Sequence, residues 1–269
     1  MNVRAKAQPE PLVSARGIVN RFGQQVVHDR IDLDILPGEI IGIAGGSGAG
    51  KSMLLKTLTG LHRPDAGEVL LDGKSVLSLG AAEKAALIGV LFQQGALFSS
   101  LSVAQNITLP MREHTKLPAK EQEQLAMMKL ALAGLPAATG NKFPSALSGG
   151  MVKRAAFARA LALDPRILFL DEPTSDLDPI SASGIDALIK QLNGSLGVTV
   201  VIVTHDLTTL FSICGRIAVL VDRKLTIGTV DQLMKSDHPW IHEFFHGPRA
   251  LGAMQARKKN HGNRGGSVC

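Results

Sequence analysis

GGSGAGKS, at residues 45–52, matches the pattern GxxxxGK[ST] at every fixed position. The apolar run EIIGIA at 39–44 precedes it and predicts a buried strand. The residues that follow, as far as Gly60, predict a helix. Strand, glycine-rich turn and helix form the context in which this pattern binds phosphate, whereas a chance lysine after a glycine-rich turn lacks that context. The segment therefore predicts a nucleotide-binding protein of the α/β class.

The chemistry of this loop follows from its residue types. Glycines let the backbone turn tightly enough for successive amide groups to point at a bound phosphate. The helix that begins here adds the positive end of its dipole. Lys51 is expected to reach the β- and γ-phosphates, and the hydroxyl of Ser52 to bind Mg²⁺. We expect ATP and Mg²⁺ to bind at Gly45, Gly46, Ser47, Gly48, Ala49, Gly50, Lys51 and Ser52.

Three further segments predict the chemistry of hydrolysis. ILFLDE at 167–172 is an apolar strand ending in two carboxylates, of which Asp171 is placed to hold Mg²⁺ and Glu172 to deprotonate an attacking water. Acidic residues often end strands, so the pair has this meaning only together with the phosphate loop. His205 follows the strand VTVVIV and is expected to contact the γ-phosphate. Gln93 follows the strand ALIGVLF and is expected to contact Mg²⁺ or the water.

The order of patterns along the chain predicts its domain organisation. Residues 1–11 are expected to form a flexible lead before one domain at 12–248, whose first part is rich in strands, including ALIGVLF at 86–92. Helical patterns bounded by prolines predict a helical insertion at about 95–158. Apolar runs then alternate with helices, which is typical of parallel strands covered on both faces. RIAVLVDRKLTIGT at 216–229 predicts a hairpin.

Composition limits the possible classes of protein. Hydrophobic residues make up 45% of the 269 residues, enough for a sizeable core, and no apolar run approaches the length that spans a bilayer. The N-terminus has no apolar stretch after its positive charges, so no secretory signal is predicted. Cys214 and Cys269 lie far apart, so we expect no disulfide framework and a reduced, cytoplasmic setting.

The net charge of +6 owes much to the C-terminal end of the chain. No acidic residue follows Glu243, and 249–269 predicts a basic, disordered tail. A solvated tail is the plainer interpretation, and contact with anionic lipid headgroups or with a partner is the functional one. Nucleic acid is not an expected partner, because aromatic residues make up only 4% of the chain and the tail has none to stack on bases.

A second glycine-rich turn, LSGGM at 147–151, changes the prediction. A lone SGG before a helix is a commonplace cap, but one nucleotide site needs no second such turn so far along the chain. The ordered set of GGSGAGKS, Gln93, LSGGM, ILFLDE, SDLD at 175–178 and His205 resembles the ATP-binding subunit of ABC transporters over about residues 12–235. The resemblance implies a P-loop fold with a RecA-like parallel core sheet, an N-terminal antiparallel β subdomain and an inserted helical subdomain.

The resemblance also implies roles for individual residues. Residues 45–52 correspond to the Walker A loop, Asp171 to the Walker B aspartate, Glu172 to the catalytic glutamate, Gln93 to the Q-loop glutamine and His205 to the switch histidine. Ser148, Gly149 and Gly150 would contact the γ-phosphate of ATP held by a second copy of the chain, and the SDLD segment would cross the interface between the copies. Phe22 stands where the family stacks an aromatic ring on adenine.

Three features resemble one branch of this family. The stretch at 91–115, the methionine of LSGGM and PWIHEFFHG at 239–247 are similar to the ATPases of MCE-type lipid transporters, above all the maintenance-of-lipid-asymmetry system of Gram-negative bacteria. The short, glycine-rich basic tail departs from that system's pattern.

This second resemblance implies phospholipid transport between inner and outer membranes, driven from the cytoplasmic face of the inner membrane. Implied partners are a second copy of the chain, a multispanning membrane permease, a periplasmic MCE lipid-binding protein and a small STAS-domain protein. An ABC transporter for another substrate is an alternative. A soluble, non-transport ABC ATPase is another, although such proteins typically carry two motif sets or a long coiled-coil insertion.

Overall fold

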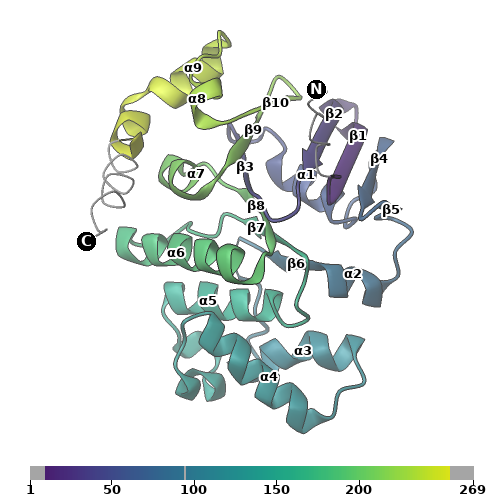
Figure 1. Ribbon diagram of the computed structural model, residues 1–269, viewed down its shortest axis with the longest axis vertical. Coiled ribbons are helices and arrows are strands. Elements are labelled where there is room, and N and C mark those ends of the chain that lie inside the picture. The colour runs from purple at the N-terminus through teal and green to yellow at the C-terminus, as the bar shows by residue number, and fades with distance from the viewer. Residues whose placement is uncertain (1–9, 94, 255–269) are drawn as a thin grey trace, which may run out of the picture.

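The computed structural model describes residues 10–93 and 95–254 and is built on two sheets (Figure 1). One sheet has six strands in the order β10-β9-β3-β8-β7-β6, and the other has four in the order β2-β1-β4-β5. Neighbouring strands of the six-stranded sheet are parallel, except that β10 runs antiparallel to β9. The predicted α/β fold with a parallel core sheet is confirmed.

The central strands of the six-stranded sheet are buried along their whole length. All six strands of this sheet are β3 (Ile40–Gly45), β6 (Ile88–Leu91), β7 (Ile167–Asp171), β8 (Thr199–Val203), β9 (Arg216–Val221) and β10 (Lys224–Gly228). Every residue of β3, β7 and β8 is buried, as expected for apolar strands covered on both faces. Because these strands are parallel, their carboxyl ends meet at one edge of the sheet, where Gly45, Asp171 and Val203 lie.

Helices cover both faces of this sheet. They are α1 (Lys51–Leu58), α2 (Ala81–Leu87), α6 (Pro179–Leu196) and α7 (Leu207–Ile213). Leu54, Leu55 and Leu58 of α1 share one buried cluster with strands of both sheets, so α1 packs between the two sheets. On the other face, Ile185 and Ile189 of α6 pack with side chains of β7 and β8.

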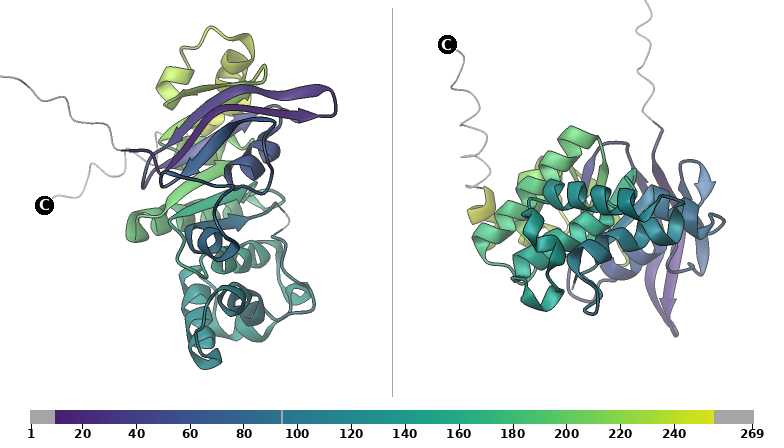
Figure 2. Two further views of the ribbon diagram at one scale, coloured as in Figure 1. Left: turned by 90° about the vertical axis from the view of Figure 1, so that its right-hand side faces the viewer. Right: turned by 90° about the horizontal axis from the view of Figure 1, so that it is seen from below.

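The N-terminal sheet is antiparallel, as the family resemblance implies. Its strands are β1 (Val13–Phe22), β2 (Gln25–Ile35), β4 (Ala66–Leu71) and the short β5 (Lys74–Ser75). The β1–β2 hairpin runs long and crosses above α1 (Figure 2, left). This sheet supplies a floor beneath the phosphate loop, since β2 contacts the start of α1.

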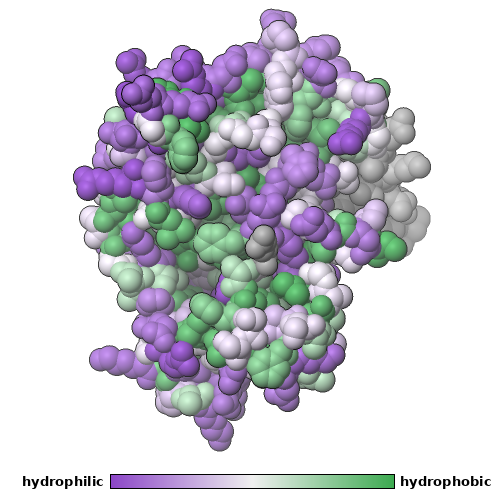
Figure 3. Space-filling model, turned by 180° about the vertical axis from the view of Figure 1, so that it is seen from behind, coloured by the Kyte–Doolittle hydropathy of each residue, from purple (hydrophilic) through white to green (hydrophobic). Residues whose placement is uncertain are grey.

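The helical insertion forms the lower part of the molecule (Figures 1 and 2). It contains α3 (Val103–His114), α4 (Ala119–Leu132), two short 3₁₀ turns (Ala137–Asn141 and Pro144–Ala146) and α5 (Gly149–Ala160). Val103, Ile107, Leu130 and Phe157 pack together at the centre of these helices. Seen from behind, apolar side chains lie among polar ones in the middle and lower part of the surface (Figure 3).

One predicted strand begins later than expected. Residues 86–92 were expected to form a strand, but Ala86 and Leu87 are the last residues of α2, and β6 covers only Ile88–Leu91. The pairing of β6 with β7 starts at Ile88 with Ile167, so the earlier residues have no strand partner. The alanine-rich sequence before Ile88 favours a helix instead.

The C-terminal segment forms more structure than the sequence predicts. The hairpin of β9 and β10 is present as predicted, and α8 (Val230–Leu233) and α9 (Pro239–His246) follow it. A further helix runs from residue 248 to 254, with Ala250 and Ala253 buried in a cluster around Phe211 and Phe245. The expected disordered tail from residue 249 is therefore wrong for 249–254, because these alanines have an apolar cluster to cover.

The remaining terminal segments, 255–269 and residues 1–9 of the predicted flexible lead, lie outside the described residues. Within the described part of the chain, no helix combines the length and the apolar character needed to cross a membrane.

Candidate functional site

The phosphate loop connects the end of β3 to the start of α1. Gly48 and Gly50 have φ angles of 75° and 101°, a region that favours glycine. At Gly50 a Cβ atom would also lie 2.4 Å from Cγ1 of Val27 and 2.7 Å from Nε2 of His28. Strand β2 therefore leaves no room for a side chain at position 50, and glycine is required there for both reasons.

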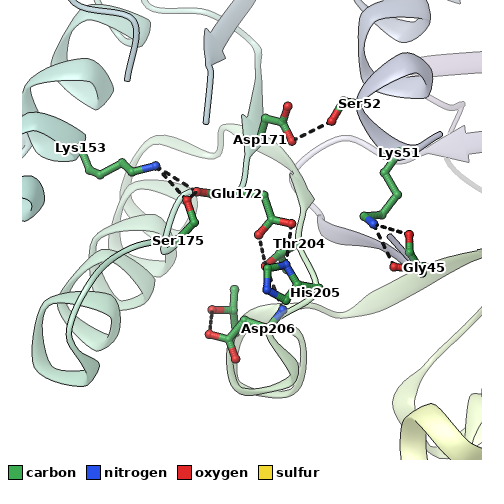
Figure 4. Close-up of polar contacts among 12 residues, drawn as sticks. Gly45, Lys51, Ser52, Lys153, Asp171, Glu172, Ser175, Thr204, His205 and Asp206 are labelled. Carbon is green, nitrogen blue, oxygen red and sulfur yellow. Dashed lines mark hydrogen bonds and ion pairs between the residues drawn. The ribbon is translucent and has the colours of Figure 1, made fainter. Parts of the chain in front are cut away.

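Lys51 folds back over the loop. Its Nζ donates hydrogen bonds to the carbonyls of Gly45 and Gly46, both at 2.9 Å (Figure 4). Burial lowers the pKa of the Lys51 ammonium, and the nearby carboxylates of Glu172 and Asp171 oppose this shift. The positive charge thus lies where the loop sequence predicts the phosphates.

A buried polar network supports the loop from below. Nδ2 of Asn20 donates to Nδ1 of His28 and to Oγ1 of Thr57, both at 2.8 Å, and all three side chains are fully buried. Burial lowers the pKa of His28 to about 4, although the nearby backbone of Gly50 acts in the opposite direction. His28 is therefore neutral near pH 7 and accepts from Asn20 beneath the loop.

Asp171 ends β7 opposite the first turn of α1. Its Oδ1 accepts a hydrogen bond from Oγ of Ser52 at 3.5 Å (Figure 4). Burial raises the pKa of Asp171, the bond from Ser52 lowers it, and the charge of Glu172 raises it further. A hydroxyl and a carboxylate are oxygen ligands that Mg²⁺ prefers, and a cation would compensate the buried negative charge. This pair of donors therefore fits Mg²⁺.

The pair cannot form a complete metal cage by itself. Among the described residues, no group of three or more His, Cys, Asp or Glu side chains is placed to hold a metal ion. Mg²⁺ usually keeps several waters and phosphate oxygens among its ligands, so two protein oxygens are compatible with an ion that arrives with a nucleotide.

Glu172 has a left-handed backbone conformation, with φ of 49°. Residues other than glycine seldom adopt it, and they do so where surrounding contacts hold them. Its N–H donates to the carbonyl of Val203 at 2.8 Å. Its carboxylate accepts from Oγ1 of Thr204 at 3.2 Å and lies 2.8 Å from Nδ1 of His205 (Figure 4). The turn at Glu172 thus aims the carboxylate at the end of β8.

The segments meet around one cavity of about 1090 Å³. From the predicted site it is lined by Gly45, Gly46, Ser47, Gly48, Gly50, Lys51, Ser52, Gln93, Glu172 and His205. Asp171 reaches this wall through its contact with Ser52. Ala49 points away from the cavity and packs against the core. Folding therefore brings together side chains that the sequence separates by more than a hundred residues.

Two predicted groups lie elsewhere. Phe22, at the end of β1, is 76% exposed and does not belong to the cavity wall as described. Ser148, Gly149 and Gly150 begin α5, where Oγ of Ser148 caps the helix by accepting from the N–H of Met151 at 3.4 Å. Ser148 and Gly149 are exposed. A single copy of the chain does not bring these residues to its own phosphate loop.

Sequence reasoning missed one wall of the cavity. Trp240, Glu243 and Phe244 of α9 and residues 247–250 line it beside the phosphate loop. The rings of Trp240 and Phe244 stack with centroids 4.8 Å apart, and the indole lies 3.9 Å from the position of a Cβ at Gly46. The single tryptophan of the chain was the available signal, but nothing local shows that α9 returns to the loop.

Sequence reasoning also missed Lys153. It follows LSGGM in α5, where a lysine is usually a solvated cation, yet its side chain is buried and its Nζ contacts the backbone of Gln93 and Glu172. Only the packing of α5 against the edge of the sheet where β6 and β7 end reveals this contact.

The fold and the cavity together define a P-loop nucleotide-binding protein: a buried parallel strand, a glycine-rich loop with Lys51 and Ser52, and carboxylates at the end of β7, which is separated from β3 by β8. The chain belongs to the ABC transporter family, whose model matches residues 28–175. Its membership makes the protein an ABC-type ATPase, which binds and hydrolyses ATP.

Relatives with similar sequences carry two kinds of name. The intermembrane phospholipid transport system ATP-binding protein MlaF of Haemophilus influenzae is 40% identical over 240 residues, which cover 88% of this chain and 90% of that protein. MlaF of Escherichia coli strain K12 is 39% identical, with 88% and 89% covered. A probable ribonucleotide transport ATP-binding protein of Mycobacterium leprae is 39% identical over 241 residues, with 88% and 69% covered.

Solved structures of the family agree with the fold. A dimeric ATP-binding cassette in a post-hydrolysis state, bound to ADP and Pi, has a TM-score of 0.73 and 32% identity, and covers 81% of this chain and 98% of its own. The cbiO1 protein of Clostridium perfringens, part of the transporter complex cbiONQ, has a TM-score of 0.76 and 28% identity, with 91% and 99% covered. The N-terminal antiparallel sheet and the helical insertion thus belong to a known cassette fold.

Proposed function

We propose that this ABC ATPase is the motor of a phospholipid transporter, and that Glu172 activates the water that hydrolyses ATP. One observation carries the chemical part of this proposal. The carboxylate of Glu172 is oriented by His205 and Thr204 at the wall of the cavity that the phosphate loop lines. A carboxylate held beside a phosphate site is placed to accept a proton from water.

The residues of the phosphate loop bind and orient the nucleotide. The loop amides and the start of α1 face the phosphates, and Lys51 moves from its carbonyl contacts to the β- and γ-phosphates. Ser52 and Asp171, with Gln93 at the cavity wall, are the proposed ligands of Mg²⁺. When bound, the ion neutralises charge that develops on the phosphate oxygens. Phe22 is exposed and free to stack on adenine.

Hydrolysis uses a water positioned beside the γ-phosphate. The water oxygen attacks the γ-phosphorus, the bond to the oxygen of ADP breaks, and the carboxylate of Glu172 accepts the proton of the water. His205 holds that carboxylate in the free protein and is placed to contact the γ-phosphate once the nucleotide is bound. ADP and inorganic phosphate are the products.

A second copy of the chain completes the site. Ser148, Gly149 and the exposed start of α5 form a helix end suited to an anion, and they do not line the cavity of the chain's own phosphate loop. At the start of α6, Ile180 is 86% exposed, beside the SDLD segment. An exposed large apolar residue next to an exposed anion site is suited to an interface. We therefore propose that two copies close around two ATP molecules.

The permease is proposed to dock beside the segment that follows Gln93. A groove of about 510 Å³ lies there, lined by apolar residues that include Phe92, Phe98 and Pro110 together with Glu113 and Arg159. Phe98 is 53% exposed. Since Gln93 lines the nucleotide cavity and Phe98 lines the groove, a short segment links the two sites. A membrane protein bound in this groove would sense the nucleotide through this segment.

The proposed cargo is phospholipid, moved between the inner and outer membranes of a Gram-negative bacterium. One support is the similarity to proteins named for intermembrane phospholipid transport, because the matched residues cover about nine tenths of each of those proteins. The other support is the pair of sequence features at 91–115 and 239–247. The proposed location is the cytoplasmic face of the inner membrane. The proposed partners are a multispanning permease, a periplasmic MCE protein and a small STAS-domain protein.

The catalytic role is tested by Glu172→Gln, with turnover and ATP binding measured separately. The amide keeps the shape of the side chain but cannot accept the proton, so we expect hydrolysis to be abolished with ATP affinity retained. Turnover close to that of the parent would refute the role of Glu172.

The cargo is tested on the complex purified from its native membranes. Mass spectrometry of the bound small molecules is expected to find phospholipid, and the protein components are expected to include a permease. Recovery of ribonucleotides without lipid would instead support the activity for which the mycobacterial relatives are named. Recovery of the chain without any membrane protein would contradict a transport function.

A further inference from the structure

Lys153 is a buried ammonium that contacts two segments of the chain, at Gln93 and at the turn from Glu172 to Ser175. It lies one turn into α5, and its side chain is only 6% exposed. Nζ donates to the carbonyl of Gln93. It also donates to the carbonyl of Glu172 at 3.1 Å and to Oγ of Ser175 at 3.3 Å (Figure 4). The three hydrogens of the ammonium therefore have three oxygen acceptors, one on Gln93 and two on the turn from Glu172 to Ser175.

Burying an ammonium in this way costs free energy, which its hydrogen bonds must offset. A buried charge loses its hydration, and burial lowers the pKa of Lys153 while Asp176, Glu172 and Asp171 oppose this shift. Lys153 forms no ion pair with any residue in the described part of the chain. Its charge is instead directed at backbone carbonyls, which are groups with a fixed position.

The carbonyl of Glu172 is the point where these contacts converge. Besides Lys153, it accepts hydrogen bonds from Oγ of Ser175 at 2.9 Å and from the N–H of Ser175 at 3.2 Å. Glu172 is the residue with φ of 49°, a conformation that costs energy for a side chain of this size. Three donors on one carbonyl stabilise that conformation against relaxation to an ordinary extended backbone, which would turn the carboxylate away from His205.

We propose that Lys153 is a positioning residue for ATP hydrolysis, which holds the backbone of Glu172 in the left-handed conformation that aims its carboxylate into the nucleotide cavity. The inference rests on the proposed catalytic role of Glu172. Lys153 does not touch the nucleotide and acts only through the backbone of Glu172 and Gln93.

The position of Lys153 in α5 gives this contact a second consequence. The same helix begins with Ser148, which is proposed to bind the γ-phosphate held by the second copy. The ammonium of Lys153 lies about one turn further along α5 and bonds to the carbonyls of Gln93 and Glu172, which line the cavity for the chain's own ATP. A shift of α5 at one nucleotide site therefore moves Glu172 at the other, and Lys153 couples the two sites of the dimer.

The experiment compares Lys153→Met and Lys153→Arg in the full-length chain. Methionine has a similar length but no donors, whereas arginine keeps charged donors. For Lys153→Met we expect kcat for ATP hydrolysis to fall at least about tenfold, with KM and the Kd for ATP within about twofold of the parent. Lys153→Arg is expected to recover most of the lost kcat. A selective loss in kcat separates misplacement of Glu172 from general loss of the nucleotide site.

Lys129→Met is the matched control. Lys129 is also 6% exposed, lies in the same helical subdomain and forms an ion pair with Asp164, away from the cavity. The Lys129→Met substitution is expected to lower the melting temperature, while kcat stays within about twofold of the parent. Lys153→Met with parental kcat would overturn the proposal, and so would an equal loss of kcat in Lys129→Met.

Ser175→Ala tests the same carbonyl should Lys153→Met fail to fold. It removes one donor to the Glu172 carbonyl and is expected to lower kcat several-fold without raising KM. Parental kcat in Ser175→Ala, with Lys153→Met unfolded, would overturn the proposal. Glu172→Gln distinguishes the two levels: if it hydrolyses ATP at the parental rate, the proposed function fails and the positioning role fails with it. If it is inactive while Lys153→Met is active, only the positioning role fails.

Discussion

The stability of the chain is expected to depend on pH through two buried groups that act in opposite directions. His28, beneath the phosphate loop, has a pKa lowered by burial from 6.5 to about 4. The unfolded chain therefore binds this proton more readily, and stability is lost as the pH falls through the window between these values. With 1.36 kcal/mol for each pH unit, lowering the pH from about 7.5 to about 5 costs about 2 kcal/mol.

Asp186 has the opposite effect. It is buried in α6, and its pKa is raised by burial from 3.8 to about 6, although the hydrogen bond from Thr209 lowers it and the charge of Asp206 raises it further. The folded chain binds this proton more readily, so acidification stabilises the protein. Over the same range from about pH 7.5 to about pH 5 the gain is about 1.4 kcal/mol. In the parent the two contributions largely cancel.

Single substitutions separate the two contributions. His28→Gln keeps an acceptor for Asn20 but does not titrate, so its free energy of unfolding should fall on acidification by about 2 kcal/mol less than that of the parent. Asp186→Asn removes the compensating gain and should fall by about 1.4 kcal/mol more. Each variant is compared with itself at the two pH values, so any loss of packing cancels.

The assay is urea unfolding followed by circular dichroism, at constant ionic strength and without nucleotide. The two variants should differ from the parent in opposite directions, by about 3.4 kcal/mol in total. Variants that both follow the parental pH dependence to within about 0.5 kcal/mol would refute the assignment of neutral His28 and protonated Asp186 to the folded state at about pH 5.

Three further predictions concern the nucleotide site. Chains carrying Ser148→Arg or Lys51→Ala should each fail to dimerise with ATP. A mixture of the two variant chains should form dimers in which one composite site carries both defects and the other is intact. Size-exclusion chromatography that finds no mixed dimer would show that the site is not shared. Gly50→Ala should weaken ATP binding at least about tenfold, because backbone strain and steric overlap each cost about 1–3 kcal/mol. Gly48→Ala is the milder control, because Gly48 has φ of 75° but open space around its Cβ position. Equal Kd values for the two variants in titrations would contradict the overlap at Gly50. ATP should change the fluorescence of Trp240, the single tryptophan, since its indole lies against the phosphate loop; unaltered emission at saturating ATP would argue against that contact.

Much of the fold could be predicted because its signals are local. The strands at 39–44, 167–170 and 198–203 are continuous apolar runs, and a strand of that kind is stable only inside a sheet covered on both faces. The glycines of the phosphate loop are dictated by backbone geometry at their own positions, so the loop can be recognised without any tertiary information. Asp171 and Glu172 were likewise predictable, because Asp171 ends such a strand and Glu172 follows it directly.

Boundaries were less predictable, since they depend on partners. Ala86 and Leu87 have side chains compatible with a strand, but only Ile88 has a neighbour on β7 with which to pair. Residues 249–254 carry a basic side chain and glycine, yet Ala250 and Ala253 find an apolar cluster built by α7 and α9. No local pattern reports a partner that lies far away in the sequence.

The amino-acid sequence alone determined the class of the protein, the phosphate loop and the carboxylates of the site, because each depends on residue types at short spacing. The tertiary structure alone placed Trp240 against the loop, left Ser148 exposed, and set Lys153 on the carbonyl of Glu172. These contacts join segments from different elements, and their distances follow only from how the helices pack on the sheet. A solvated lysine in a helix and a buried lysine that donates to the carbonyl of Glu172 can have the same local sequence and differ only in what surrounds them.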